Sequence, residues 1–155
     1  MTCIFRLTLA IFLALSILPA SAEPKVGAGK MKSPAGVTAA ALKNRIVIQI
    51  NEDDAKKWIA VLANIRNIQA ELGAKNVSIA VVAISYGLGM LTAESLAAND
   101  VQDALVTGVE FIACGNSMQA QKVAKEDLVD GVTIAKAGYV EIMKRQQQGW
   151  SYLRP

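Results

Sequence analysis

Short apolar runs rich in β-branched residues alternate along this chain with segments whose apolar residues recur at helical spacing. The runs cover residues 45–50, 76–85, 109–113 and 132–134. Such runs are typical of strands that are buried on both faces of a sheet. Strands that alternate with helices form a mainly parallel sheet. We therefore predict a three-layer α/β/α domain with four to five strands, the last at residues 150–153.

The segments between these runs predict the helices. Asn51 and the acidic residues after it resemble a capping box for a first helix that ends before Gly73. An Ala-rich segment reaching Ala98 has helical composition. Further helices are predicted over residues 99–107, 117–128 and 138–147.

The first 22 residues have the parts of a secretory signal peptide in the usual order. Arg6 precedes an uncharged apolar run at residues 7–18, which is shorter than the roughly 20 residues needed to cross a bilayer. Pro19 ends this run, and the sequence Ala-Ser-Ala at residues 20–22 fits a signal-peptidase site. We predict cleavage after Ala22, with an uncleaved N-terminal anchor as the alternative.

Removal of this segment defines the organisation of the mature chain. Residues 23–44 are rich in Pro, Gly and Lys and predict a flexible tether. Residues 45–155 hold the predicted strands and helices. We therefore expect one periplasmic or otherwise exported domain.

The charge balance bears on the kind of partner. The chain has 16 Lys and Arg residues against 13 Asp and Glu residues. So small an excess gives no reason to expect a polyanionic partner. We predict no nucleic-acid binding, and no membrane binding after signal cleavage.

Cys114 is one of two cysteines in the chain. Cleavage after Ala22 would remove the other, Cys3, so the exported protein would have a single thiol and no internal disulfide. An unpaired cysteine in an exported protein indicates a reactive thiol or an intermolecular bond. Cys114 also ends a predicted strand and precedes a helix, where backbone N–H groups can lower the pKa of a thiol.

The absence of histidine excludes several chemistries. With His 0 in the sequence, a Ser-His-Asp or Cys-His relay cannot be built from this chain. One cysteine does not supply a tetrahedral zinc site. The pair Gly87 and Gly89 suggests a dinucleotide loop, but Thr92 occupies the position of the third glycine. We predict no cofactor and no metal.

Ligands of parallel α/β sheets bind beyond the carboxyl ends of the strands, and the predicted site follows from the turns there. The predicted catalytic residue is Cys114, its predicted anion-stabilising neighbours are Gly115, Asn116 and Ser117, and the residues predicted to border the pocket are Asn51, Tyr86, Gly87 and Lys136.

Three segments together resemble exported single-domain members of the DsrE/DsrF-like family: GVEFIACGNSM, AGYVEI and the C-terminal RQQQGWSYLRP. The resemblance covers roughly residues 45–155. It implies an α/β/α domain, assembly into homotrimers or hexamers, and a cysteine that carries sulfur as a persulfide between partner proteins. By chain position, that cysteine corresponds to Cys114.

The expected function is therefore that of an exported sulfur carrier or sulfurtransferase-like protein. Its partner would be a thiol-bearing protein that donates or accepts sulfur. Two alternatives stay open: an oligomeric binding or scaffold protein in which Cys114 is buried and inert, and a redox sensor that forms an intermolecular disulfide through Cys114.

Overall fold

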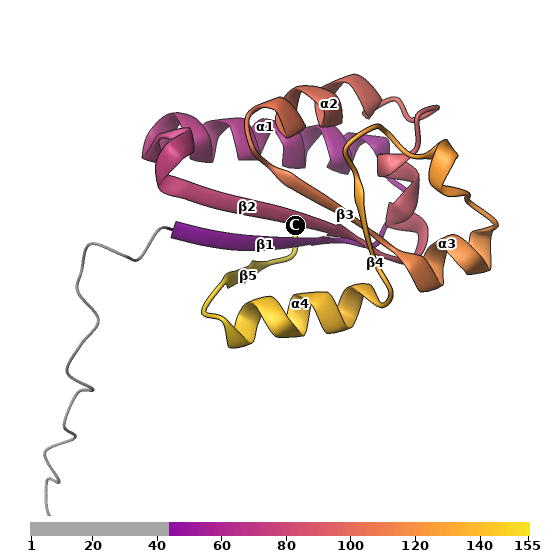
Figure 1. Cartoon of the computed structure of the whole chain (residues 1–155). Helices are drawn as coiled ribbons and strands as arrows, with labels where there is room; N and C mark the ends of the chain where they lie inside the picture. Colours follow the sequence, from indigo (N-terminus) through magenta and orange to yellow (C-terminus); the bar gives the residue numbers. More distant parts are fainter. Residues whose placement is uncertain (1–43) are drawn as a thin grey trace, which may run out of the picture. The chain divides into compact units, whose positions relative to one another are not determined.

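The computed structural model describes residues 44–155, in which a five-stranded sheet lies between helices (Figure 1). The strands are β1 (Asn44–Ile50), β2 (Val77–Ala83), β3 (Glu110–Cys114), β4 (Thr133–Ala135) and β5 (Ser151–Leu153). All are parallel, in the order β4-β3-β2-β1-β5. This sheet confirms the predicted fold class and includes the fifth strand.

Helices cover both faces of the sheet. In Figure 1, α1 (Ala55–Leu72) and α2 (Ala98–Val106) lie on one face and α4 (Gly138–Gln147) lies on the other. The short helix α3 (Gly115–Gln121) lies at the carboxyl ends of the strands. Three layers are therefore present, as predicted.

Strand β2 shows why apolar residues occupy successive positions in the predicted strands. Its neighbouring residues Val81 and Val82 are both 0% exposed. Val81 packs in the cluster that contains Trp58 and Ile65 of α1, whereas Val82 packs in the cluster that contains Ile142 of α4. Successive side chains of a strand point to opposite faces, so helices on both sides require a continuous apolar run.

The N-terminus of α1 differs from the prediction. Asp54, not Asn51, is the N-cap residue, and its carboxylate accepts hydrogen bonds from the backbone N–H groups of Lys56 (3.0 Å) and Lys57 (3.2 Å). The helix starts after Asp54 because this carboxylate satisfies two of its free N–H groups. At its other end, Gly73 has a φ of 80°, which fits the predicted helix stop.

The Ala-rich segment before Ala98 is not an α-helix. Residues Ser85–Leu91 form the 3-10 helix η2, and the next residue, Thr92, has extended backbone. The backbone there bonds across to another segment: Ala93 N–H donates to the Asp127 carbonyl (2.8 Å) and Val129 N–H to the Leu91 carbonyl (2.9 Å). These tertiary hydrogen bonds replace those of a helix, so local composition was misleading.

Helix α3 is earlier and shorter than the predicted 117–128 segment. It begins at Gly115 and ends at Gln121, where Lys122 adopts a left-handed φ of 58°. The chain then forms the 3-10 helix η3 (Lys125–Asp127). The left-handed residue ends the helix, and sequence periodicity did not reveal it.

The predicted signal peptide lies outside the described residues, as does the predicted tether except for Asn44. That residue begins β1, so the strand starts one residue earlier than the predicted run. Within residues 44–155, no helix is long and apolar enough to span a membrane.

Candidate functional site

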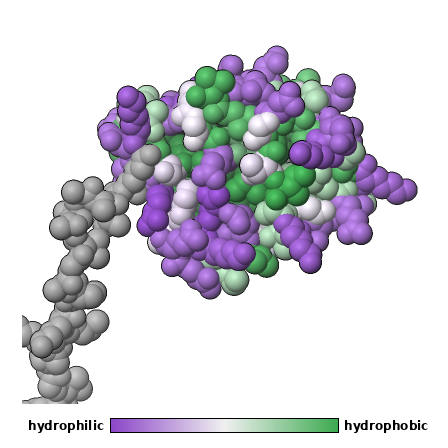
Figure 2. All heavy atoms as spheres, viewed as in Figure 1, coloured by the Kyte–Doolittle hydropathy of each residue, from purple (hydrophilic) through white to green (hydrophobic). Residues whose placement is uncertain are grey.

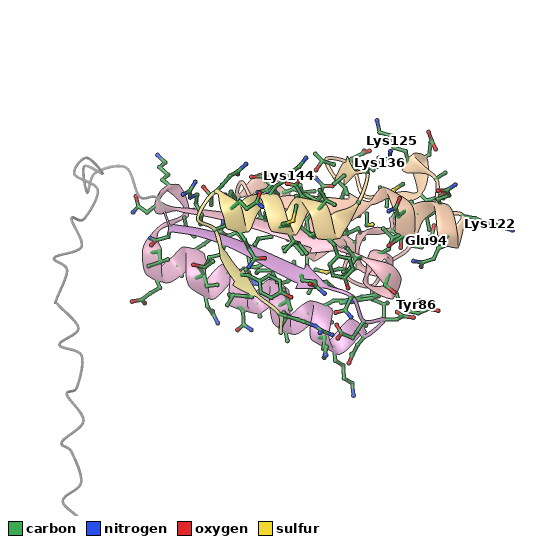
Figure 3. The ribbon with its side chains drawn as sticks, turned by 90° about the horizontal axis from the view of Figure 1, so that it is seen from below. Tyr86, Glu94, Lys122, Lys125, Lys136 and Lys144 are labelled. Atoms are coloured by element: carbon green, nitrogen blue, oxygen red, sulfur yellow. The ribbon has the colours of Figure 1, made fainter. Side chains whose placement is uncertain are left out.

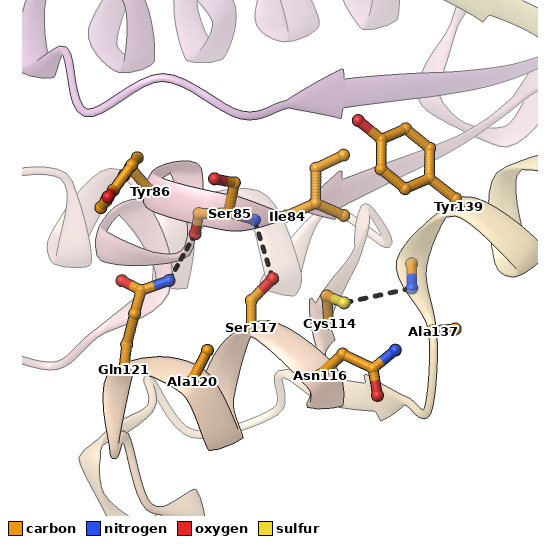
Figure 4. Close-up of a pocket in the computed structure, with 11 residues that line it drawn as sticks. Ile84, Ser85, Tyr86, Cys114, Asn116, Ser117, Ala120, Gln121, Ala137 and Tyr139 are labelled. Atoms are coloured by element: carbon orange, nitrogen blue, oxygen red, sulfur yellow. Dashed lines mark hydrogen bonds between the residues drawn. The ribbon is translucent and has the colours of Figure 1, made fainter.

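Cys114 ends β3 and is the N-cap residue of α3, so it lies at the carboxyl edge of the sheet. Its side chain packs on the α4 face with Val82, Ile84 and Ile112, and the residue is 5% exposed. The backbone N–H of Gly138 donates to its Sγ at 3.3 Å (Figure 4). The sulfur therefore meets the N-terminus of α4 as well as that of its own helix.

Gly138 is what allows α4 to approach the sulfur. A Cβ on this residue would lie 2.3 Å from Cγ2 of Ile84 and 3.2 Å from Cβ of Cys114. Any other side chain would push the start of α4 away from the sheet. Sequence reasoning missed Gly138 as a site residue, although a glycine in a helix is unfavourable enough to suggest a close packing contact.

The surroundings of Cys114 shift its pKa in two directions. Burial raises the pKa of the thiol. Hydrogen bonds from the Ser117 side chain and from backbone N–H groups together lower it by a larger amount, so the pKa lies below its ordinary value. The backbone donors are, in decreasing order, Gly138, Ser117 and Asn116. The Asn116 N–H also donates to the Lys136 carbonyl at 3.1 Å. The site thus favours the thiolate.

This shift predicts a pH-dependent contribution to stability. Because the folded-state pKa of Cys114 is depressed, the stabilisation is present above the unfolded pKa, which is about 8.5 for a free thiol, and is lost as the pH falls through the folded pKa. We expect the free energy of unfolding of the native chain, relative to Cys114→Ser, to increase with pH across that interval. Denaturant titrations at several pH values would measure it, and a difference that stays constant would contradict the shift.

A cleft of about 430 Å³ opens beside the sulfur. We call it the Cys114 cleft. Figure 4 shows its lining residues, which come from the segment directly after β2, the end of β3, the length of α3 and the start of α4: Ile84, Ser85, Tyr86, Cys114, Asn116, Ser117, Ala120, Gln121, Ala137, Gly138 and Tyr139. None of these residues is Asp, Glu, Lys or Arg. Tyr86 and Tyr139 are 68% and 66% exposed, so aromatic rings are available to a molecule that approaches the thiol.

Ser85 has an unusual backbone conformation within this lining. Its φ is +48°, in the left-handed region that costs a non-glycine residue about 1–2 kcal/mol. Two side chains of α3 hold it there. The Ser85 N–H donates to Oγ of Ser117 at 2.8 Å, and the Gln121 side-chain amide donates to the Ser85 carbonyl at 2.7 Å.

The structure brings four of the predicted site residues to the cleft: Tyr86, Cys114, Asn116 and Ser117. Gly115 does not line it, because a Cβ there would instead face the carbonyls of Ala135 and Lys136 at 3.4 Å. Sequence reasoning missed Ser85, Gln121, Gly138 and Tyr139.

The other three predicted pocket residues do not line the cleft. A Cβ on Gly87 would lie 2.5 Å from the carbonyl oxygen of Ile50, so this glycine serves close packing against β1. Asn51 lies after β1, and its Oδ1 is buried without a hydrogen-bond partner. The Lys136 side chain is at the surface, where Figure 3 labels it. Sharing the carboxyl edge was therefore not enough to bring these side chains to the sulfur.

A metal centre is not evident in the described part of the chain. Within residues 44–155, no group of three or more His, Cys, Asp or Glu side chains is arranged to hold a metal ion.

Comparison with known proteins gives structural neighbours only. No family model and no curated protein sequence matches the chain. MTH1491 from Methanobacterium thermoautotrophicum, a protein of unknown function, is 38% identical; the match covers 72% of this chain and 99% of that one with a TM-score of 0.69. BT1422 from Bacteroides thetaiotaomicron, also of unknown function, is 13% identical over 72% and 95%, with a TM-score of 0.62. The ychN protein from E. coli is 12% identical over 74% and 100%, with a TM-score of 0.61. The last two show the fold alone.

Proposed function

This chain belongs to the same family as MTH1491, a protein of unknown function, and we propose the function of the chain from the Cys114 cleft. The chain is a sulfur carrier that holds sulfane sulfur as a persulfide on Cys114. We also propose that this family is DsrE/DsrF-like, since the segments around Cys114 and at the C-terminus resemble it. The observation that carries the proposal is the hydrogen bonding of the Cys114 sulfur, which favours its thiolate at the wall of a cleft.

The absence of a base within the cleft fits this role. A thiolate is the nucleophilic form of cysteine, and here it is favoured by N–H and hydroxyl donors from α3 and α4. No histidine is needed to remove the proton, and the sequence has none. A carrier that only accepts and releases sulfur needs no further acid or base of its own.

The proposed reaction is an exchange between sulfur atoms. The Cys114 thiolate attacks the outer sulfur of a donor persulfide, R–S–SH. The S–S bond of the donor breaks, R–S⁻ leaves, and Cys114 becomes Cys–S–SH. A thiolate of the acceptor then attacks the outer sulfur of Cys114, which releases the Cys114 thiolate again. No net oxidation or reduction takes place.

Mass spectrometry of the intact chain tests this proposal. We expect a Cys3→Ser chain, incubated with polysulfide at pH 7 and then freed of it, to gain sulfur on Cys114, and a thiol reductant to remove that sulfur. The matched control carries Cys114→Ser in addition and should gain none. No uptake by the first chain, or equal uptake by both, would refute the proposal.

One observation favours a second candidate, the scaffold with an inert thiol. Cys114 is only 5% exposed, and free cysteine often packs as a small hydrophobe. Alkylation of Cys114 in the folded Cys3→Ser chain separates the two. A carrier thiol reacts while the chain is folded, with a midpoint below about pH 8.5, whereas a scaffold thiol reacts only after denaturation.

The proposed partners are further copies of the chain and a thiol-bearing protein that supplies or receives the sulfur. Exposed apolar side chains support assembly into a trimer or hexamer: Tyr139 (66%), Val140 (43%) and Met143 (48%) on α4, with Tyr152 (37%) and Leu153 (46%) on β5. Figure 2 shows that apolar residues also reach the surface among polar ones on the face in view. Export to the periplasm is part of the same proposal and rests on the signal-like first 22 residues.

A further inference from the structure

Ser85 is the one residue of the Cys114 cleft with a left-handed backbone, at φ +48°. It follows β2 by two positions and does not contact the sulfur through any hydrogen bond of its own. Both of its backbone polar groups are instead bonded to side chains of α3, the helix that begins directly after Cys114.

The two α3 side chains are four residues apart and therefore lie on the same face of the helix. Ser117 accepts from the Ser85 N–H at 2.8 Å, and Gln121 donates to the Ser85 carbonyl at 2.7 Å. Figure 4 shows Ser117 between Ser85 and Cys114, with Gln121 on the far side of Ser85. Gln121 thus fixes Ser85, and Ser85 is bonded to the hydroxyl beside the sulfur.

Ser117 is the third residue of α3. Its hydroxyl oxygen accepts the Ser85 N–H, and the hydroxyl still has its own hydrogen to donate. A donor that occupies the hydroxyl oxygen from the Ser85 side fixes the side-chain rotamer. The hydroxyl hydrogen is then free to point toward Cys114, in keeping with the hydrogen bond by which Ser117 favours the thiolate.

We propose that Ser85 and Gln121 are positioning residues for Cys114. Gln121 holds the left-handed Ser85 backbone, so that the Ser85 N–H directs the Ser117 hydroxyl to the sulfur. The inference rests on the proposed use of Cys114 as a thiolate. It does not depend on the transfer of sulfur, so the two can fail separately.

Few other groups can affect the charge on the sulfur. The titratable side chains that line the cleft besides Cys114 are Tyr86 from η2 and Tyr139 from α4, and no Asp, Glu, Lys or Arg lines it. The loop before α4 contains one charged residue close to Cys114 in the fold, Lys136, and its side chain is at the surface. A change in the pH profile of Cys114 can therefore be traced to the hydrogen bonds.

The test is the pH dependence of Cys114 alkylation in the full chain carrying Cys3→Ser. We expect Gln121→Ala to move the midpoint of the alkylation profile to higher pH, equivalent to an about threefold smaller acid dissociation constant of Cys114, which is the size expected for one hydrogen bond lost. Gln119→Ala is the matched control, because Gln119 is also exposed on α3 but does not line the cleft; its profile should equal that of the parent. Equal profiles for all three chains would overturn the inference.

A double-mutant cycle separates positioning from a general loosening of the site. If Gln121 acts through Ser117, Gln121→Ala combined with Ser117→Ala should have the profile of Ser117→Ala alone. Additive effects would show that Gln121 acts independently and would overturn the inference. Ser85→Gly keeps the N–H and suits a positive φ, so its profile should stay that of the parent; a profile like that of Ser117→Ala would mean that the Ser85 side chain, and not its N–H, is what matters.

Discussion

Replacing Gly138 by alanine is expected to lower the free energy of unfolding by about 2–3 kcal/mol, the upper range for overpacking a core. The new Cβ would lie 2.3 Å from Cγ2 of Ile84, which is 2% exposed, and 3.2 Å from Cγ1 of Val82. Both neighbours are β-branched and buried, so they have little freedom to rotate. Relief requires α4 to move away from β2, and this movement also takes the Gly138 N–H away from the Cys114 sulfur.

Gly138→Ala should therefore change two measurements together. Denaturant unfolding would report the loss of stability, and alkylation against pH would report a higher pKa for Cys114, since one of the donors that lower it is lost. Gly115→Ala is the matched control beside the same sulfur. Its Cβ would meet only ordinary contacts at 3.4–3.5 Å, so both measurements should stay close to those of the parent. A stable Gly138→Ala chain with an unchanged pKa would contradict the role of α4.

Replacing Gly87 by alanine is expected to lower the free energy of unfolding by a similar amount, about 2–3 kcal/mol. Here the clash is with backbone: Cβ would lie 2.5 Å from the carbonyl oxygen of Ile50 and 2.7 Å from the nitrogen of Asn51. The same Ile50 carbonyl accepts the N–H of Ile84 at 2.8 Å. A side chain at Gly87 would separate the end of β1 from the end of β2 and strain that hydrogen bond.

The Gly87 substitution differs from the Gly138 substitution in what it leaves intact. Gly87 does not line the Cys114 cleft, so we expect the pKa of Cys114 in the folded chain to remain low despite the lost stability. Denaturant unfolding and alkylation against pH, on the same samples, separate the two effects. A raised pKa with unchanged stability would show that Gly87 belongs to the site, as the sequence had suggested.

Most of the fold followed from local patterns. Residues 45–50 predicted β1 because they are rich in β-branched apolar residues. The helical spacing from Trp58 to Ile65 predicted α1, and these residues are buried in that helix. The errors arose where contacts outside the segment decide its structure. The stretch before Ala98 bonds to residues 127–129, and Lys122 ends α3 in a left-handed conformation.

The candidate site was only half predictable. Cys114, Asn116 and Ser117 are neighbours in sequence, so the end of a strand and the start of a helix were enough to group them. Gly138 lies 24 residues after Cys114, and its proximity depends on how closely α4 packs on the sheet. Ser85 and Gln121 form their hydrogen bond across 36 residues, which no spacing rule could have indicated.

By itself, the sequence determined the parallel α/β sheet, because continuous apolar runs and helical spacing describe which faces of each element are buried. It also determined that the described domain has one thiol, at the carboxyl end of a strand, and no histidine to activate it. Only the tertiary structure decided which groups lower the pKa of that thiol. The donors to the sulfur come from α3 and α4, and α4 can reach the sulfur because Gly138 has no side chain to collide with Ile84 and Cys114.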